Sequence, residues 1–359
     1  MLPLVNLRRL IPLLLLVSLL GCADRYPALQ IGDPAPVAVL VGSPGKPRAE
    51  RVIVISVDGC RPDALPVAGA EAIQKLIARG AYCPKAETIR PSITLPSHTS
   101  MLTGLDFDHH GIVWNNYRTG YIVHPTVFSV AAQAGKKSAM LFSKDKFHFL
   151  ANPACVSWVY GPPTPSKLPK REDYSDVEQL KEMLRKEEEA AKQPPKKNAP
   201  TPTPSPGDLM TTADKLAAAF ALAWPREKWP LTFIHFREAD ENGHRKGWMG
   251  PEYLEAIRTI DQAIASIVET IEKNGGFQKT ALIISADHGG SNRGHYRWTD
   301  PEKVENVTIP WVCVGPGVPA GLTIDRVIRT YDTAPTALNF LGLGTPAGID
   351  GKAVEEVLR

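Results

Sequence analysis

The amino-acid sequence predicts one large α/β domain in which a mostly parallel β-sheet is covered by helices on both faces. Short apolar runs, mostly rich in β-branched residues, alternate with helix-like stretches along the 359 residues, and this alternation is typical of parallel sheets. Three of the runs also end close to an aspartate, and the carboxyl ends of strands are where such sheets place their functional sites. The expected strands are residues 51–56, 137–142, 231–236, 280–285 and 308–314.

The clearest helix is expected at residues 251–273. Pro251 suits a first helical turn, and Gly275-Gly276 follows the segment as a stop signal. Between them, apolar residues recur at helical spacing, namely Leu254, Ile257, Ile260, Ile264, Ile267, Val268 and Ile271. We interpret this apolar stripe as part of the hydrophobic core.

Residues 1–21 resemble a bacterial lipoprotein signal peptide. Arg8-Arg9 form a short positive region, residues 10–20 are apolar but too short to span a bilayer comfortably, and Leu19-Leu20-Gly21-Cys22 follows. The resemblance implies cleavage before Cys22, a lipid on Cys22 and export to the bacterial cell envelope. Ala23 in place of Asp further implies the outer membrane, with the protein facing the periplasm. An ordinary secretory signal with an incidental cysteine is the alternative.

Two segments depart from the globular pattern. Residues 22–50 are rich in Pro, Gly and Ala and are expected to form a tether between membrane and domain. The domain itself should extend over residues 51–359, interrupted by a Pro- and charge-rich insertion at about residues 161–207. We expect this insertion to be a flexible connection with a charged helix of a few turns. A substrate lid or an arm for a partner is the alternative.

Charge and cysteine content exclude some functions. The formal net charge of +3 falls to +1 without Arg8 and Arg9, so we expect no nucleic-acid polymer as partner. After Cys22, the cysteines are irregularly spaced without a Cys-x-x-Cys pair, which excludes a structural zinc site of that kind. They are Cys60, Cys83, Cys155 and Cys313, and an oxidising compartment would allow one or two disulfides among them.

Aspartates and histidines occur in short segments that each follow an apolar run. Asp58 follows residues 51–57, Asp240 and His244 come shortly after residues 231–236, and Asp287-His288 follow residues 280–286, with His295 seven residues later. Because the carboxyl ends of neighbouring parallel strands meet at one edge of a sheet, these donors are expected to come together. Such oxygen and nitrogen ligands suffice for two Zn²⁺-type ions that share one substrate, as in phosphoryl-transfer hydrolysis.

The order of the motifs resembles the alkaline phosphatase superfamily, and within it the type I phosphodiesterase and nucleotide pyrophosphatase group. The motifs are Val57-Asp58-Gly59, Thr94-Leu95-Pro96-Ser97-His98, His110-Gly111-Ile112, Asp240-x-x-Gly243-His244 and Asp287-His288-Gly289. The resemblance extends from about residue 50 to the end, apart from the insertion. It implies an alkaline-phosphatase-like central sheet and a metal-dependent hydrolase of small phosphate esters.

The resemblance also assigns ligands to two divalent ions, with Zn²⁺ expected first and Mn²⁺ or Fe as alternatives. One ion would be bound by Asp58, Asp287, His288 and the nucleophile Thr94. The second would be bound by Asp240, His244 and a third histidine, for which we choose His295. His235 is the rival for this last position, but alternation along its strand should bury it.

Thr94 is the expected nucleophile, and it would form a phosphothreonine intermediate. A hydroxyl needs activation by a metal, and a helix amino terminus stabilises the phosphate that it attacks. Ser92, Ser97 and Thr99 are nearby alternatives. Asn115, or its neighbour Asn116, matches the amide that donates to a non-bridging oxygen in the family. Lys144, followed by Lys146, resembles the Lys-x-Arg that contacts phosphate in threonine-nucleophile alkaline phosphatases.

Diesters or nucleotide-type substrates are expected first and phosphate monoesters as a close second. A sulfatase is less favoured, because Thr94-Leu95-Pro96-Ser97-His98 lacks both the oxidisable residue and the Arg of the Cys-x-Pro-x-Arg frame. A catalytically dead, lipid-anchored binding protein is least favoured, because every expected ligand is present. The sequence leaves the oligomeric state open.

Overall fold

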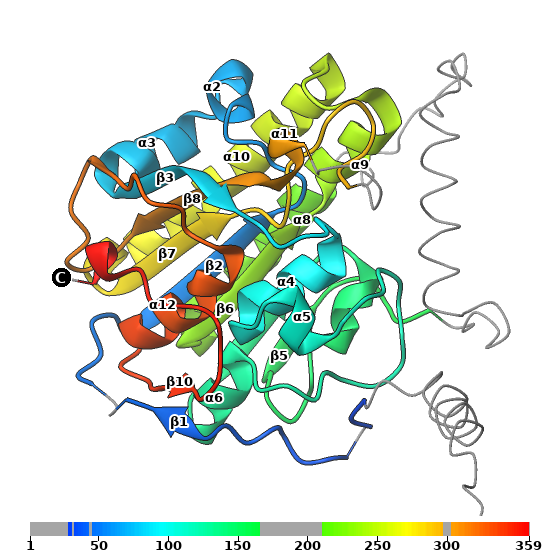
Figure 1. Ribbon diagram of the computed structural model, residues 1–359. Helices are drawn as coiled ribbons and strands as arrows, with labels where there is room; N and C mark the ends of the chain where they lie inside the picture. Colours follow the sequence, from blue (N-terminus) through cyan, green and yellow to red (C-terminus); the bar gives the residue numbers. More distant parts are fainter. Residues whose placement is uncertain (1–27, 31, 43–44, 166–209, 297–302, 359) are drawn as a thin grey trace, which may run out of the picture.

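The computed structural model describes residues 28–30, 32–42, 45–165, 210–296 and 303–358. Their centre is an eight-stranded sheet with the strand order β5-β4-β6-β2-β7-β8-β3-β9 (Figure 1). The pairs among β5, β4, β6, β2 and β7 are all parallel, whereas β8 runs antiparallel to both β7 and β3. The mostly parallel α/β sheet expected from the sequence is therefore confirmed.

The elements have the following bounds. The strands are β1 (Leu40–Val41), β2 (Arg51–Val57), β3 (Ala81–Glu87), β4 (Ser138–Leu141), β5 (Trp158–Tyr160), β6 (Leu231–Phe236), β7 (Thr280–Ser285), β8 (Thr308–Val314), β9 (Leu322–Thr323) and β10 (Thr345–Pro346). The α-helices are α2 (Ala64–Ala68), α3 (Glu71–Arg79), α4 (Thr94–Thr103), α5 (Phe107–His110), α6 (Val127–Gln133), α8 (Thr212–Glu227), α9 (Glu238–Lys246), α10 (Pro251–Lys273), α11 (Val304–Val307) and α12 (Thr333–Phe340). Short 3₁₀ helices are η1 (Asp145–Phe149), η3 (Gly276–Gln278), η4 (Thr330–Asp332) and η5 (Glu355–Val357).

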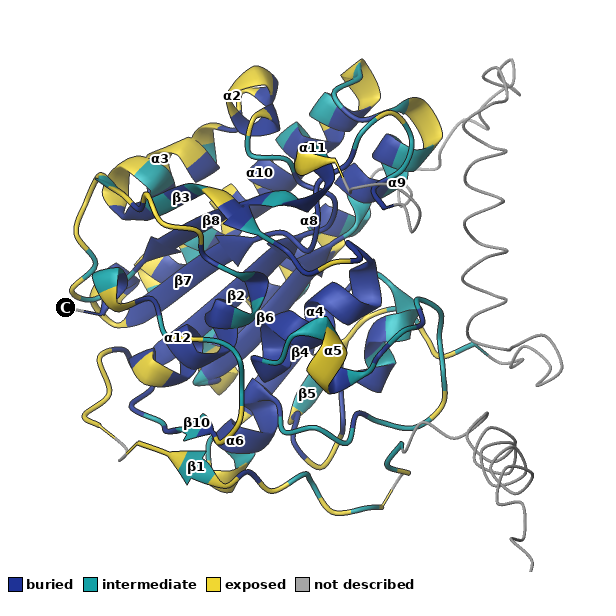
Figure 2. Cartoon of the chain, in the orientation of Figure 1, coloured by how far each residue is buried: buried dark blue, intermediate teal, exposed yellow. Residues whose placement is uncertain are grey.

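Helices cover both faces of the sheet. On one face α10 contacts α2, α3, α8 and α9, and on the other α12 contacts α4 and α6. Helix α10 has the predicted bounds, and its apolar stripe is buried apart from Leu254 and Val268, which are partly buried at its margin. Figure 2 shows the sheet between the two helix layers almost entirely as buried residues. The central strands β2, β6 and β7 are buried along their whole length, as expected for strands covered on both faces.

The five predicted strands are β2, β4, β6, β7 and β8, and β4 is two residues shorter than expected. Strand β3 was not predicted, because it contains Pro84 and the exposed Lys85 in its interior. A proline cannot donate a hydrogen bond to a neighbouring strand. The structure accommodates it at a shift of register between Cys83 and Ala86, where β3 pairs with β8.

Part of the segment expected to be a tether packs on the domain. Strand β1 pairs with β10, and the side chain of Gln133 donates to the carbonyl of Ala38 and accepts from its N–H, at 3.2 and 3.1 Å. Ala38 and Ala49 are buried. Residues 1–27, including Cys22, and residues 166–209 of the insertion lie outside the described residues, so the lipid anchor and the insertion stay predictions.

The four cysteines in the described part of the chain, Cys60, Cys83, Cys155 and Cys313, are buried and unpaired. The disulfides that the sequence allowed are therefore not formed there. Across the described ranges, no helix is long and apolar enough to cross a membrane.

Asp261 of α10 caps the neighbouring helix α3. Its two carboxylate oxygens accept hydrogen bonds from the backbone N–H groups of Ala72 and Ile73, at 2.9 and 2.8 Å. These groups lie in the first turn of α3, where no intrahelical acceptor is available. Helix α3 has no N-cap side chain of its own, so Asp261 from a distant part of the chain provides the cap.

We expect Asp261→Ala to lower the free energy of unfolding by about 1–2 kcal/mol, since two N–H groups near the core lose their acceptor. Urea denaturation followed by circular dichroism measures this change. The matched control is Gln262→Ala, at the exposed neighbouring position, which should stay within about 0.5 kcal/mol of the parent. An Asp261→Ala variant as stable as the parent would contradict the capping role.

Candidate metal centre

The predicted ligands come together at the carboxyl ends of three adjacent strands. Asp58 follows β2, Asp240 lies in the first turn of α9 just after β6, and Asp287 and His288 follow β7. The sheet order places β2 between β6 and β7, so parallel pairing brings these four side chains to one edge. All four are buried.

Gly59 allows Asp240 to approach Asp58. The backbone at Gly59 has φ +71°, and a Cβ there would lie 2.9 Å from the Cα of Asp240. Both the conformation and the close approach require glycine. The N–H of Asp240 donates to the carbonyl of Asp58 at 3.1 Å, which ties the first turn of α9 to the end of β2.

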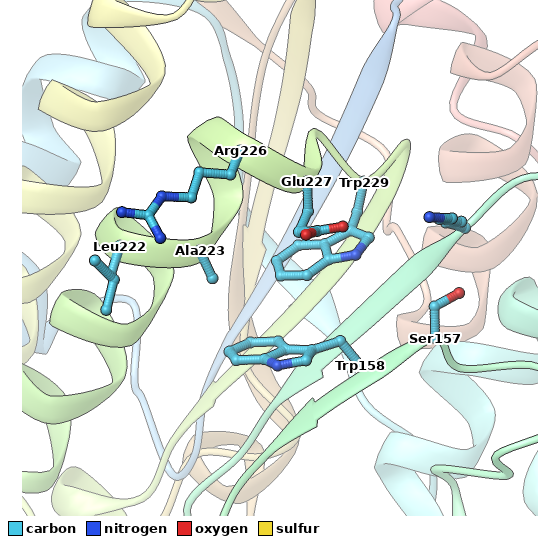
Figure 3. A pocket seen from close by; sticks show the side chains of 8 residues that line it. Ser157, Trp158, Leu222, Ala223, Arg226, Glu227 and Trp229 are labelled. Carbon is cyan, nitrogen blue, oxygen red and sulfur yellow. The ribbon is translucent and has the colours of Figure 1, made fainter.

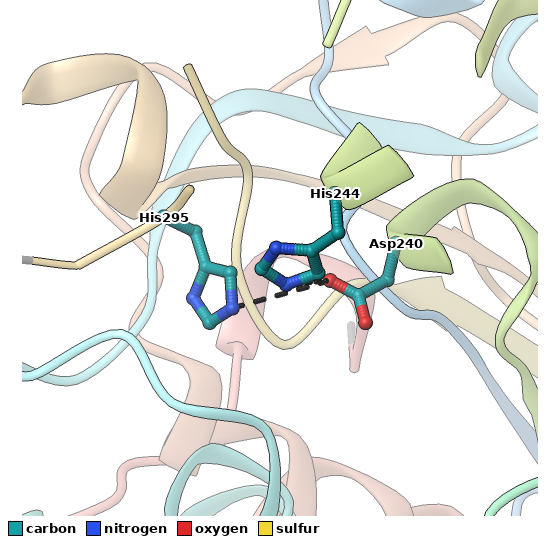
Figure 4. Close-up of side chains that lie close together, drawn as sticks. All are labelled: Asp240, His244 and His295. Atoms are coloured by element: carbon teal, nitrogen blue, oxygen red, sulfur yellow. Dashed lines mark ion pairs between the residues drawn. The ribbon is translucent and has the colours of Figure 1, made fainter. Parts of the chain in front are cut away.

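Two groups of side chains have the geometry to hold a metal ion. Asp240, His244 and His295 form one group (Figure 4), and Asp58, Asp240 and His288 form the other. Within each group the ligand atoms lie within 4.8 Å of one another. The first group is the set that the sequence assigned to the second ion. In the other group Asp240 stands where Asp287 was expected, so Asp240 belongs to both.

Asp287 adjoins the group of Asp58, Asp240 and His288 through one oxygen. Its Oδ1 accepts from the N–H groups of Gly59 and His288, at 3.1 and 3.0 Å. Its Oδ2 lies 3.2 Å from Nε2 of His288. Asp287 is thus oriented toward the cluster by backbone hydrogen bonds, as a ligand oxygen requires.

The three histidines present the same ring nitrogen to the cluster. Nδ1 of each ring lies within hydrogen-bonding distance of a backbone carbonyl: His244 with Arg293 at 3.0 Å, His288 with Gly289 at 2.9 Å and His295 with Ser92 at 2.5 Å. A proton on Nδ1 leaves Nε2 as a lone-pair donor. Burial lowers the pKa of both His288 and His295, which keeps these rings neutral and able to bind a metal.

The residues present fit a pair of divalent cations. Among the described residues, three buried carboxylate oxygens in the cluster have no hydrogen-bond partner: Oδ1 of Asp58, Oδ1 of Asp240 and Oδ2 of Asp287. A buried carboxylate oxygen without a partner is costly unless a cation neutralises it. The donor set of carboxylate oxygen and imidazole nitrogen suits Zn²⁺, Mn²⁺ and Fe.

Lys144 lies against the ligand carboxylates. Its Nζ is 2.5 Å from Oδ2 of Asp58 and 2.6 Å from Oδ2 of Asp240. Burial alone would lower the pKa of Lys144, but these two carboxylates raise it above its usual value. Burial and Asp240 would raise the pKa of Asp58, yet Lys144 and His235 hold it well below its usual range. One ammonium cannot neutralise three carboxylates, and burial together with Asp58 raises the pKa of Asp287.

Thr94 begins helix α4 at the rim of the cluster. The residue is buried, and its Oγ1 lies 3.4 Å from Nε2 of His288. The alternative hydroxyls are engaged elsewhere: Ser92 donates to the carbonyl of His295, Ser97 accepts from Thr88 at 3.0 Å, and Thr99 donates to Leu95 at 2.8 Å. Of these four hydroxyls, that of Thr94 contacts the imidazole of His288 in the cluster.

Asn115 and Lys146 form a pair beside the start of α4. Oδ1 of Asn115 accepts from the N–H of Leu95 at 3.0 Å and from Nζ of Lys146 at 2.8 Å. Two donors on the oxygen identify the other side-chain atom as the NH₂ group, which can then donate to a ligand. Burial and the neighbouring Lys144 lower the pKa of Lys146 to about 8.

His235 and His98 lie beneath the cluster. Nε2 of His235 is 2.9 Å from Oδ2 of Asp58, and Nδ1 is 3.1 Å from the hydroxyl of Ser143. Both ring nitrogens are thus occupied by hydrogen bonds. His98 contacts Ser56 and the carbonyl of Thr94, each at 2.7 Å. These residues support Asp58 and the first turn of α4 from the core.

Trp248 is a residue of the site that the sequence interpretation missed. Its Nε1 donates to the carbonyl of Gly59 at 3.0 Å, and its indole packs edge-on against His244. A Cβ at Gly243 or Gly290 would lie 2.5 or 2.1 Å from this indole. Gly243 and Gly290 are the signal in the sequence that could have indicated a bulky neighbour, because both positions leave room for the indole ring.

Residues 52–300 match the sequence model of the family described as type I phosphodiesterase / nucleotide pyrophosphatase. Among curated proteins, arylsulfatase K of Bos taurus is 25% identical over 303 residues, which cover 72% of this chain and 56% of that protein. GPI ethanolamine phosphate transferase 1 of Gibberella zeae is 36% identical over 95 residues, which cover 26% of this chain and 9% of that protein. The chain thus spans less than two thirds of the length of these relatives.

Solved structures with the same fold include several hydrolases. The alkaline phosphatase PafA superposes with a TM-score of 0.65 at 14% identity, covering 87% of this chain and 99% of that one. Murine ectonucleotide pyrophosphatase/phosphodiesterase 5, solved in complex with AMP, has a TM-score of 0.61 at 13% identity, covering 86% and 99%. At such low identity these similarities show the fold, and they confirm the alkaline-phosphatase-like architecture.

Proposed function

Because this chain belongs to the type I phosphodiesterase / nucleotide pyrophosphatase family, we propose that it is a metal-dependent hydrolase of phosphoric esters that acts through a phosphothreonine on Thr94. The observation that supports this proposal most directly is the position of the Thr94 hydroxyl. It lies at the first residue of α4, 3.4 Å from His288, a member of the group formed by Asp58, Asp240 and His288.

Two divalent ions, which we expect to be Zn²⁺, would supply Lewis-acid stabilisation of the phosphate oxygens when bound. The first would be held by Asp58, Asp287, His288 and the Thr94 oxygen. The second would be held by Asp240, His244 and His295. Because Asp240 belongs to both ligand groups, we propose that this carboxylate couples the two sites.

Thr94 would attack phosphorus as the bond to the leaving oxygen breaks, and its hydroxyl proton would pass through solvent to the departing group. Water then cleaves the bond between Oγ1 and phosphorus, which returns the hydroxyl and releases the phosphate. Each attack inverts the phosphorus centre, so the net outcome is retention. The amino end of α4 stabilises the negative phosphate throughout.

Asn115 and Lys146 would bind the non-bridging oxygens. The NH₂ group of Asn115 is left to donate because its oxygen is already bonded to Leu95 and Lys146. Lys146 adds a positive charge beside that amide. The sequence interpretation placed Lys144 in this role, but its ammonium lies between Asp58 and Asp240. We therefore propose that Lys144 orients the ligand carboxylates and that Lys146 contacts the substrate.

Diesters and nucleotide-type substrates are the first candidates because of the family. Monoesters are the second, and Lys146 beside Asn115 supports them, since a monoester dianion gains more from an added cation than a diester does. Sulfate esters are third. Arylsulfatase K is among the relatives, but Thr94 stands in a segment without the Cys and Arg that a sulfatase of this superfamily would need.

A panel of aryl phosphate diesters, monoesters and sulfates, assayed with one metal-loaded preparation, tests the substrate class. Diester turnover should exceed monoester turnover, with sulfate turnover lowest. Sulfate as the best substrate would overturn the proposal. Metal content near zero in the purified chain would instead favour the alternative of a binding protein without catalysis.

We expect Lys146→Ala to lower monoester turnover about tenfold and diester turnover by less than about threefold, because only the dianion depends strongly on the added charge. Lys144→Ala should lower both alike, since it acts through Asp58 and Asp240. The matched control is Lys85→Ala on the exposed part of β3, which should change neither. Equal losses with Lys146→Ala would exclude a direct contact with the substrate.

Localisation is a separate proposal, for which the support is the sequence of residues 1–22 alone. We propose that the chain is exported and anchored in the bacterial cell envelope by a lipid on Cys22. The enzyme would then act on small phosphate esters in the periplasm.

A further inference from the structure

The edge of the sheet opposite the metal centre is rich in cations. Exposed lysines or arginines precede four strands: Lys46 and Arg48 before β2, Lys137 before β4, Arg226 in the last turn of α8 and Lys228 just after it before β6, and Lys279 before β7. Two exposed carboxylates lie among them, Glu50 and Glu227, and Glu50 pairs with Lys279 at 3.0 Å. This edge therefore carries an excess of positive charge.

A row of exposed valines lies next to these cations. Val37, Val39 and Val41 alternate along an extended segment and are 77%, 77% and 52% exposed. The segment is held to the domain, since Ala38 between the first two valines is buried and exchanges two hydrogen bonds with Gln133. Gln133 ends α6, four residues before Lys137. The valines are thus fixed in place on an outer surface instead of turning inward.

A cavity with two indoles opens on the same edge. The cavity has a volume of about 370 Å³, and Lys137, Arg226 and Glu227 are among its lining residues. Figure 3 shows Trp158 and Trp229 among the residues that line the cavity, and their rings stack on each other with centroids 4.9 Å apart. Leu222, which also lines the cavity, is 67% exposed. Lys137 lines this cavity and follows Gln133, which holds the valine row, by four residues.

We propose that the amino-end face of the sheet lies against an anionic lipid bilayer. This face consists of Val37, Val39 and Val41, the indole cavity and the cations before β2, β4, β6 and β7. Exposed aliphatic side chains beside lysine and arginine are the composition that binds the headgroup region of membranes. Of the two indoles, Trp158 is partly exposed and could add to this contact, whereas Trp229 is buried. Each lysine or arginine near an anionic leaflet strengthens attachment roughly fivefold.

A protein partner fits this face less well. Lysine is depleted in protein–protein interfaces, whereas lysine is frequent among the cations here. The chain upstream also favours a membrane: Cys22, where the sequence predicts the lipid, comes seven residues before Leu29, which pairs with Tyr121 of the domain. A lipid on Cys22 would therefore hold Leu29 within about 25 Å of the bilayer, and the cations of the amino-end face favour turning that face toward an anionic leaflet.

The proposed orientation directs the metal centre away from the membrane. The amino-end face and the candidate ligands lie at opposite ends of the parallel strands, and the seven residues of β2 separate them by roughly 20–25 Å. An enzyme held in this way would meet its substrates in the aqueous phase and not in the bilayer.

The test uses the full chain reconstituted into phosphatidylglycerol vesicles whose acyl chains carry bromine. An environment-sensitive fluorophore is attached at Val39→Cys, and the matched control is Val67→Cys in α2, which is 60% exposed and follows the carboxyl end of β2. The four described cysteines are buried, and the unsubstituted chain gives the labelling background. We expect bromine to quench the label at residue 39 and iodide in solution to quench the label at residue 67.

Charge reversal tests the electrostatic part. A triple variant combines Lys137→Glu, Arg226→Glu and Lys228→Glu. We expect it to lower quenching at residue 39 to the level at residue 67. Unchanged turnover in detergent would show that the fold is kept. Equal quenching of the two labels, or failure of the chain to float with the vesicles, would overturn the proposal. A residue-39 label shielded from iodide without quenching by bromine would also overturn it, because another protein copy would then cover the face.

Discussion

Replacing Thr94 with alanine should leave two metal ions bound to each chain and lower turnover of phosphate esters by a factor of about a thousand or more. The variant loses the only hydroxyl that would form the covalent intermediate, and losses of this size are usual when a nucleophile is removed. The carboxylates and imidazoles that would bind the ions are unchanged, so metal content should not fall. Steady-state kinetics and elemental analysis measure the two quantities on one preparation.

Thr99→Ala is the matched control for this experiment. Thr99 lies in the same helix and is also buried, but its hydroxyl donates to the carbonyl of Leu95 and does not reach the cluster. We expect its turnover to stay within a few-fold of the parent. Unchanged activity in Thr94→Ala would mean that another hydroxyl, or water directly, attacks phosphorus. Loss of metal in Thr94→Ala would mean that the threonine oxygen is needed to hold an ion.

Replacing Asp240 with asparagine should remove more metal than replacing any other single ligand. Asp240 is the one residue shared by both ligand groups of the described chain, and a neutral amide oxygen is a much weaker ligand than a carboxylate. We expect metal content to fall from two ions to well below one and turnover to fall by about a thousandfold or more. Elemental analysis after dialysis against dilute metal, together with kinetics, measures both effects.

His244→Ala provides the comparison, since His244 belongs to one group only. This variant should keep one ion. Glu241→Gln is the matched control beside Asp240, because Glu241 pairs with Arg237 at 3.1 Å and takes no part in either group. It should keep both ions and full turnover. If Asp240→Asn and His244→Ala retained equal metal, the coupling of the two sites through Asp240 would be wrong.

Several features of the fold and site could be predicted from local sequence. The central strands were recognised because strands covered on both faces are continuous apolar runs, as in β2, β6 and β7. Helix α10 was recognised from its spacing and end signals. The positions of Asp58, Asp240 and Asp287 followed from the ends of these runs, because parallel strands direct their carboxyl ends to one edge.

Features that depend on distant contacts could not be predicted. Strand β3 contains Pro84, and its place in the sheet depends on its pairing with β8. Trp248 lies near His244 in sequence, but its contacts with the carbonyl of Gly59 and with Gly290 exist only in the folded chain. The same holds for Asp261, which caps a helix almost two hundred residues away.

The sequence by itself determined the fold class and most of the elements, and it predicted the kind of chemistry. Periodicity, turn residues and the order of Asp, His and Thr motifs are local properties of the chain, and they sufficed for the fold class and the candidate ligands. Only the tertiary structure decided which candidate ligands lie together and which lysine adjoins Asn115. Lys144 and Lys146 are two residues apart, yet one contacts Asp58 and Asp240 and the other contacts Asn115. The direction of each side chain depends on how η1 packs against β6 and α4, and sequence spacing carries no information about that packing.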